Sequence, residues 1–160
     1  MPSQNQVDST DARLLLALND VPRATTVALA EQTGLSRNTV QARLARLDDR
    51  LELHERRVSP KQLGYPLTAY VTTQVQQRLL DEVAGALAGI DEVIQVQNIS
   101  NQTDLLVQVV ATDADDLYRI AGQILAIEGV ERTNTALVMR ELVDYRLTPL
   151  IRRCATGATD

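Results

Sequence analysis

The sequence predicts an α+β chain, with a helical first third followed by a longer βαββαβ part. In the first third, apolar residues recur three and four positions apart, which is the spacing of amphipathic helices. From residue 68, segments rich in β-branched residues alternate with helical patterns. Pro60 and Pro66 break regular structure in between. We therefore divide the chain into a helical domain at 1–51, a linker at 52–66, a mixed domain at 67–150 and a tail at 151–160.

Two helices are expected before residue 35. The first begins after Asp8, whose carboxylate can cap it, and its apolar pattern ends near Asp20. The second is short and starts with a threonine cap, at Thr25 or Thr26. Gly34 is placed to end it, because glycine readily adopts the left-handed conformation that closes a helix.

A third helix is predicted over the segment LSRNTVQARLARL, residues 35–47. Ser36 can cap this helix, and Leu35 can meet Val40 as a hydrophobic staple across its first turn. Small Ala30, the turn residue Gly34 and apolar Val40 have the spacing of a helix-turn-helix, a motif that binds DNA. One apolar stripe of the helix is formed by Val40, Leu44, Leu47 and Leu51.

The open faces of the third helix carry arginine, asparagine and glutamine, and no acidic residue occurs from Gln32 to Leu47. Arginine reads guanine and asparagine or glutamine reads adenine, so these residue types suit the major groove. An ordinary solvated helix is the alternative on charge alone. We expect Arg37, Asn38, Thr39 and Gln41 to face the bases. Arg43 and Arg46 are expected either to face phosphates or to pack within the domain. The predicted DNA-binding residues are Thr26, Ser36, Arg37, Asn38, Thr39, Gln41, Arg43 and Arg46.

The second part reads as strand, helix, strand, strand, helix, strand, which predicts a ferredoxin-like domain. Such a domain has a four-stranded antiparallel sheet with both helices on one face. The other face is then uncovered, and a small sheet with one bare face tends to dimerise. The expected elements are strands at 68–75, 93–99, 104–111 and 133–142, a helix from residue 79 that stops at Gly89, and a helix marked by Leu117, Ile120, Ala121, Ile124 and Leu125 that Gly129 closes.

Composition sets further bounds. The chain is 44% hydrophobic without Trp or Phe, so an aliphatic core is expected. Up to residue 62 there are nine Lys and Arg against eight Asp and Glu, and thereafter seven against thirteen, so only the first part is expected to touch phosphate. The linker charges at 54–61 form either a basic wing near DNA or a solvated surface. The polar residues 1–6 are expected to be a mobile tail.

One cysteine, Cys154, gives no disulfide framework and fits a reducing cytoplasm. No apolar run is long enough to span a membrane. His54 is the only histidine, so we expect no metal site, cofactor or catalytic Ser-His couple. Disorder is expected from Ala155 onwards.

Taken together, the motifs make the chain resemble the Lrp/AsnC family of transcription regulators, over roughly residues 7–150. The first domain matches in VDSTDARLLLALNDVPR, in LAEQTGLS, and in Arg43 and Arg46 before Leu47. The second matches in LGYPLTAYV from Leu63, in the residues 104–107 and in GVERTNTALVM from residue 129. The resemblance implies a DNA-binding regulator whose C-terminal domains pair into dimers, with assembly to tetramers or octamers and amino-acid effectors between dimers.

The effector region implied by the resemblance contains one departure. The family usually has a Gly-Asp-Tyr-Asp turn before its third strand, and this chain has Asn101-Gln102-Thr103-Asp104. Asp104 can take an ammonium group, and turn amides with threonine hydroxyls can take a carboxylate. The alternative is that Asp104 caps its own turn. The implied effector residues are Ser100, Asn101, Gln102, Thr103, Asp104, Thr133 and Thr135.

Two other functions compete with a sequence-specific regulator. An architectural DNA-compacting protein would discriminate weakly between sites. Some haem-biosynthesis decarboxylases also look like this family, but they need basic or imidazole groups in the C-terminal cleft. Because this chain has no histidine beyond His54, we expect a regulator and no enzyme.

Overall fold

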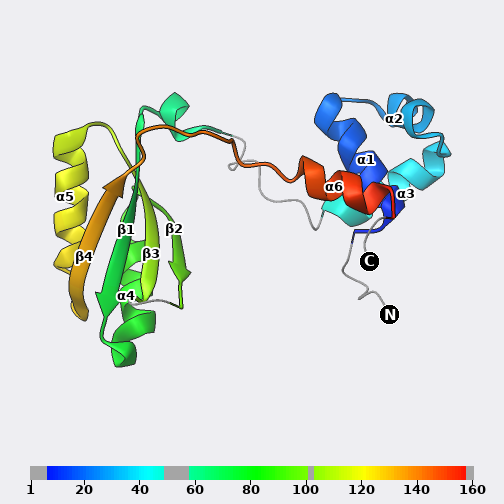
Figure 1. Ribbon diagram of the computed structural model, residues 1–160. Coiled ribbons are helices and arrows are strands. Elements are labelled where there is room, and N and C mark those ends of the chain that lie inside the picture. Colours follow the sequence, from blue (N-terminus) through cyan, green and yellow to red (C-terminus); the bar gives the residue numbers. More distant parts are fainter. Residues whose placement is uncertain (1–6, 49–57, 101–102, 158–160) are drawn as a thin grey trace. The chain divides into compact units, whose positions relative to one another are not determined.

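The computed structural model describes residues 7–48, 58–100 and 103–157. The chain divides into two compact units, a helical one and one built on a sheet (Figure 1). The first unit combines Met1–Leu53 with Val143–Asp160, and the second spans His54–Leu142. The expected tail at 1–6 and the last stripe residue, Leu51, lie outside the described residues.

The three predicted N-terminal helices are present and capped as expected. Asp8 Oδ1 accepts a hydrogen bond from the Asp11 amide at 2.8 Å, and the Asp11 carboxylate accepts one from the Asp8 amide at 3.3 Å, a capping box. Thr25 caps the second helix, and Gly34 ends it with a φ of 69°. These helices are α1 (Ser9–Asp20), α2 (Thr26–Thr33) and α3 (Arg37–Asp48).

A small aliphatic core holds these helices together. Small Ala30 lies in it, as the predicted close helix crossing requires, and Leu35 packs against this core, of which Val40 is a member. Arg13 of α1 adds a polar contact by donating a hydrogen bond to the Thr33 carbonyl at the end of α2. The buried members of this core are Leu14, Ala17, Leu29, Ala30 and Val40.

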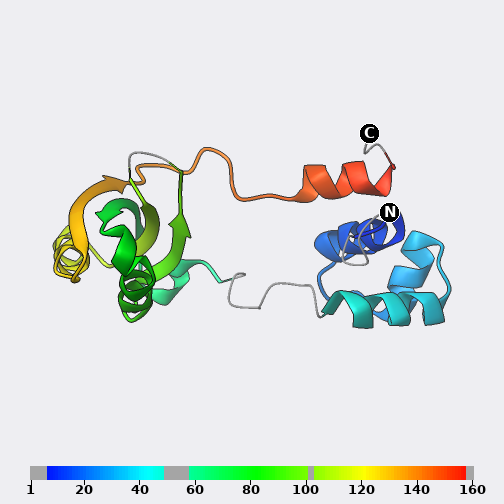
Figure 2. The same cartoon turned by 90° about the horizontal axis from the view of Figure 1, so that it is seen from below.

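A further helix, α6 (Thr148–Ala155), belongs to the same unit and packs against α1. The prediction of disorder from Ala155 is therefore wrong for Ala155 itself, which ends α6. The physical reason is a short apolar stripe: Ile151, Cys154 and Ala155 are half-buried at helical spacing, whereas Arg152 is exposed. In Figure 2, α1 lies between α6 and α3.

The second unit has the predicted ferredoxin-like fold. Its four strands form one antiparallel sheet in the order β2-β3-β1-β4. A short 3-10 helix, η2 (Pro60–Leu63), precedes the sheet, and η3 (Gln77–Leu79) leads into α4. The elements are β1 (Leu67–Val75), α4 (Leu80–Ala88), β2 (Val93–Asn98), β3 (Leu105–Ala111), α5 (Ala114–Leu125) and β4 (Val130–Leu137).

Both helices cover one face of this sheet. Alternate residues of the two central strands, among them Val71 and Val107, are fully buried against α4 and α5. The opposite face carries exposed side chains, including Tyr70 and Gln74 of β1. The helices contribute Val83 and Leu87 from α4 and Ile120 and Ile124 from α5, and Figure 2 shows both on the same side of the sheet.

Three details of the second unit differ from the sequence prediction. β4 begins at Val130, which already pairs with Val75, and it ends at Leu137, where its register with β1 ends opposite Ala69. Leu125, expected on the buried stripe of α5, is 51% exposed. Gly129 does not close α5, whose C-cap is Ala126.

Gly129 instead forms the turn before β4, with a φ of 93°. A Cβ atom there would lie 2.9 Å from Leu79 Cδ1, so the turn requires glycine for two separate reasons.

The linker was expected to be a wing or a solvated connector. Its residues 52–57, including His54, lie outside the described residues. Between Val58 and Pro66 the structure has the 3-10 helix η2 and no strand, so this described stretch contains no wing hairpin. No helix in the described ranges is both long and apolar enough to cross a membrane.

Candidate nucleic-acid interface

The start of α3 is fixed by its serine cap. Ser36 Oγ accepts a hydrogen bond from the Thr39 amide at 3.1 Å, and a second bond of 2.8 Å joins the two hydroxyls. The Ser36 carbonyl accepts from the Val40 amide at 3.0 Å, which begins the helical ladder. Ser36 and Thr39 therefore shape the helix end as well as lying at the predicted interface.

The outward face of α3 carries polar side chains in its N-terminal half and small side chains further along. Arg37, Asn38 and Gln41 are exposed, whereas Val40 is fully buried. Ala42 and Ala45 are also exposed and follow on the same open side. A face of this kind lets long side chains reach out at one end while the backbone approaches a partner closely at the other.

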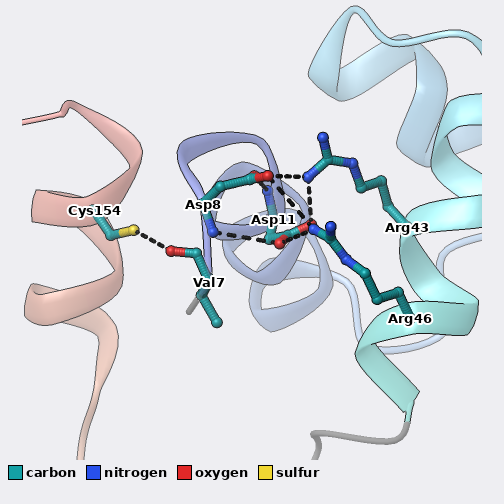
Figure 3. A network of polar contacts seen from close by, with 6 residues as sticks. All are labelled: Val7, Asp8, Asp11, Arg43, Arg46 and Cys154. Atoms are coloured by element: carbon teal, nitrogen blue, oxygen red, sulfur yellow. Dashed lines mark hydrogen bonds and ion pairs between the residues drawn. The ribbon is translucent and has the colours of Figure 1, made fainter. Parts of the chain in front are cut away.

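The side chains of Arg43 and Arg46 differ from these exposed residues, because both are bound to carboxylates of α1. Arg43 contacts the carboxylates of Asp8 and Asp11, with 3.0 Å between its Nη1 and Asp11 Oδ1. Arg46 contacts the same two residues, with 3.5 Å to Asp8 Oδ2. Figure 3 shows both guanidinium groups extending from α3 to the N-terminus of α1. Both arginines therefore make contacts within the domain, which is one of the two roles predicted for them.

The network formed by Asp8, Asp11, Arg43 and Arg46 joins two carboxylates to two guanidinium groups. Burial raises the pKa of the Asp8 carboxyl, but the Asp11 amide and the guanidinium groups of Arg43 and Arg46 outweigh this and lower that pKa to about 2. Hydrogen bonds to Asp8 and Asp11 raise the pKa of Arg43 above its ordinary value. Asp11 is the buried member, with a side chain that is 0% exposed.

Sequence reasoning missed the partners of the two arginines. Asp8 and Asp11 lie three residues apart on one helix, and Arg43 and Arg46 are spaced in the same way on another. Matched spacings of opposite charge were the available signal. Of the other predicted DNA-binding residues, Thr26 is half-buried at the start of α2.

In the predicted effector region, Asp104 is hydrogen-bonded within the protein, whereas other residues are exposed. Asp104 Oδ2 accepts a hydrogen bond from the Val75 amide at 2.8 Å, and its Oδ1 accepts one from the Gln77 side chain. Its own amide donates to the Thr73 carbonyl at 3.0 Å. Asp104 therefore ties the start of β3 to the end of β1, a role that neither of the two predictions for this residue included. Asn101 and Gln102 lie outside the described residues.

A shallow polar hollow of about 260 Å³ lies beside this tie. Thr103 and Thr133 line it, whereas Thr135 and Ser100 are exposed and do not. Arg132 supplies its only charged lining group among the described residues. The remaining lining residues are Thr72, Gln74 and Asn134. Elsewhere in the described ranges, no three His, Cys, Asp or Glu side chains are grouped as a metal site.

Family models cover both units. The AsnC-type helix-turn-helix domain matches residues 7–48, and the Lrp/AsnC ligand binding domain matches residues 68–148. The chain belongs to the Lrp/AsnC family. The resemblance seen in the sequence is confirmed, and this Lrp/AsnC protein is a DNA-binding transcription regulator.

Individual relatives agree with the family. The chain is 29% identical over 144 residues to the proline dehydrogenase transcriptional activator of Rhizobium radiobacter, covering 86% of this chain and 92% of the relative. Escherichia coli AsnC has the same fold, with a TM-score of 0.79 at 22% identity over 90% of this chain and 99% of that one. A Neisseria meningitidis regulator, solved with L-methionine, gives a TM-score of 0.77 at 24% identity, over 91% and 99%.

Proposed function

We propose that this Lrp/AsnC regulator reads specific DNA sites as a homodimer by placing the N-terminal half of α3 in the major groove. The observation that carries the proposal is the outward face of α3, where Arg37, Asn38 and Gln41 are exposed on a capped helix. These three residue types match guanine and adenine edges. Because its target is chromosomal DNA, we place the protein in the cytoplasm.

The contacts divide along the helix. Arg37, Asn38, Thr39 and Gln41 lie in its first half, where a recognition helix meets the bases. We assign to Thr26 and Ser36, at the starts of two helices, contacts with the DNA backbone, to which hydroxyl groups can donate. Arg43 and Arg46 are already bound to carboxylates, so the proposal gives them no base contact.

Asn38→Ala tests the base contact. The site is first identified by selecting genomic DNA fragments with the full chain. The affinity of the protein is then measured for this site and for each single-base variant of it. The variant is expected to lose on the order of 1–3 kcal/mol at one base pair and to stop discriminating there. Asn19→Ala, an exposed asparagine at the end of α1, is the matched control and should bind as the wild type does. Unchanged discrimination in Asn38→Ala refutes the placement of α3. Weak discrimination by the wild type itself favours an architectural protein.

Dimerisation is proposed through the uncovered face of the sheet. Tyr70 lies on this face in β1, between Gln108 of β3 and Ala136 of β4. Tyr70 is 37% exposed, and burying an aromatic ring in a self-complementary interface is favourable. Two recognition helices of such a dimer would read half-sites roughly 34–36 Å apart, or a multiple of that. Further assembly to a tetramer or octamer is part of the same proposal.

Tyr70→Asp tests the interface, because it places a charge in the proposed contact. Tyr118→Asp is the matched control, since Tyr118 is 83% exposed on α5, on the other side of the sheet. Sedimentation of the full chain should show dimers or larger assemblies for the wild type and Tyr118→Asp, and monomers for Tyr70→Asp. A wild-type monomer, or a Tyr70→Asp dimer, contradicts the proposal.

An amino acid is proposed as the effector, by analogy with the L-methionine complex of the Neisseria meningitidis relative. In this chain Asp104 is engaged, so the carboxylate of a ligand has a better partner in Arg132, which lines the hollow together with Thr103 and Thr133. The remaining predicted positions, Ser100, Asn101, Gln102 and Thr135, belong to the same proposal.

Calorimetry against the common amino acids tests this site. Binding of at least one is expected, together with a shift in sedimentation or DNA affinity. Arg132→Ala should remove the heat, whereas Arg78→Ala, another exposed arginine of this unit, should not. No heat with any amino acid and no change in assembly would remove amino acids as effectors.

A further inference from the structure

The four-residue network between α1 and α3 has a role that goes beyond the exposed face of the recognition helix. It joins the capping box of α1 to the C-terminal half of α3, and both guanidinium groups contact both carboxylates. Figure 3 shows this network at the N-terminus of α1, which α6 contacts from the other side: Cys154 Sγ donates to the Val7 carbonyl at 3.1 Å. We call Asp8, Asp11, Arg43 and Arg46 the clasp.

We propose that Asp8 and Asp11 are positioning residues that set where α3 lies against α1, and that Arg43 and Arg46 serve DNA binding through these carboxylates and not by contacting phosphate. This inference rests on the proposed function. An exposed arginine on a recognition helix would ordinarily be assigned to the DNA backbone. Here Arg43 Nη1 and Arg46 Nη2 each contact the carboxylates of both Asp8 and Asp11, so a phosphate would have to compete with two carboxylates for these guanidinium groups.

Burial supports this assignment. The Asp11 side chain is 0% exposed, and the Arg43 side chain is 28% exposed. Freeing Arg43 for a phosphate would leave a buried carboxylate with fewer partners, which is costly. The capping box also holds the two carboxylates through bonds that do not involve α3, so they form a preorganised acceptor pair.

The position of the clasp along α3 explains what it does. Apolar Val40, Leu44 and Leu47 hold one side of α3 against the domain. The clasp attaches α3 at Arg43 and Arg46, beside this apolar stripe, so the two attachments together fix the orientation of the helix about its own axis. A small rotation of α3 would move Arg37 and Asn38 relative to base edges, whereas non-specific attraction to phosphates would change little.

Asp8→Asn is the discriminating variant. Asparagine is as good an N-cap as aspartate, so α1 can still start in the same way while the charge that faces the arginines is removed. Asp113→Asn is the matched control: Asp113 caps α5 by accepting from the Asp116 amide at 2.8 Å, and no ion pair to it occurs among the described residues.

The measurement compares affinity for the selected site and for unrelated DNA at several salt concentrations, with the full chain. Asp8→Asn and Arg43→Gln are each expected to lower the ratio of specific to non-specific affinity about tenfold. The double variant should lose no more than either single variant. The slope of log K against log salt should stay at the wild-type value, because no phosphate contact is lost. Asp113→Asn should leave the ratio and the slope unchanged.

The opposite assignment gives different results. If Arg43 contacts phosphate, Arg43→Gln lowers the magnitude of the slope by about 0.9, and Asp8→Asn leaves or raises affinity because it frees the guanidinium. Either result overturns the inference. So does an unchanged affinity ratio in Asp8→Asn.

Hydrogen exchange separates this inference from the proposed function. In the absence of DNA, Asp8→Asn should speed exchange of amides in residues 43–48 while those of α1 keep their protection. If the wild type binds no specific DNA, the proposed function fails, and exchange still decides whether the clasp positions α3. Unchanged exchange in α3 overturns the positioning role whatever the protein binds.

Discussion

The carboxylate of Asp104 should stabilise the second unit by about 2 kcal/mol, and this value follows from one hydrogen bond. The register of β1 with β4 shifts between Gln74 and Val75, and the Val75 amide donates at this irregularity to Asp104 Oδ2 at 2.8 Å. A hydrogen bond to a charged group contributes about 1.5–3 kcal/mol, and losing it leaves a partly buried amide without an acceptor. The second bond, from the exposed Gln77 side chain, adds little.

Thermal unfolding of Asp104→Ala, followed by circular dichroism at one protein concentration, measures this contribution. A loss of about 2 kcal/mol should lower the midpoint by roughly 10 °C in a unit of this size. Asp91→Ala removes an exposed carboxylate from a turn of the same unit and should leave the midpoint near that of the wild type. Asp104→Asn keeps one acceptor oxygen and should fall between. If Asp104→Ala melts with the wild type, the tie between β1 and β3 does not contribute as argued.

The remaining predictions concern single positions. Gly129→Ala should destabilise by about 2 kcal/mol in urea unfolding, because φ is 93° and its Cβ would meet Leu79, whereas Gly122→Ala, in an open helical position, should be neutral or stabilising. The pKa of Asp8 is lowered to about 2, so its contribution to stability is complete above pH 4 and is lost as pH falls towards 2. Asp8→Asn should remove this part of the pH dependence of the free energy of unfolding, which is on the order of 1 kcal/mol after solvent screening. Ala42→Glu should abolish DNA binding in a shift assay without lowering the melting temperature, since Ala42 is exposed on the open face of α3.

Local patterns in the sequence predicted most of the fold. The caps at Asp8 and Thr25, the left-handed Gly34 and the period-2 strands depend on neighbouring residues, and the structure confirms each of them. The predicted limits of β4 were wrong because a strand ends where its pairing ends, and pairing with β1 is not a local property. The helix α6 was missed because its stripe is short and requires α1 to bury it.

The same holds for the candidate site: features that depend on neighbouring residues could be predicted, and features that depend on distant residues could not. The exposed residues of α3 could be predicted because helical periodicity separates its buried stripe from its open face. The engagement of Arg43 and Arg46 could not be settled, because their partners lie more than 30 residues away and charge alone does not choose between phosphate and carboxylate. The same holds for Asp104, whose acceptor role depends on an irregularity in a distant strand pair.

The return of α6 to the helical unit has a consequence for synthesis of the chain on the ribosome. The first helices emerge early, but the surface of α1 that α6 covers stays bare until residues 148–155 have been made. The sheet unit, whose residues lie between these segments, is therefore complete before the DNA-reading unit. Every nascent or truncated chain that stops short of α6 therefore carries a complete sheet unit and a helical unit in which α1 lacks the packing of α6.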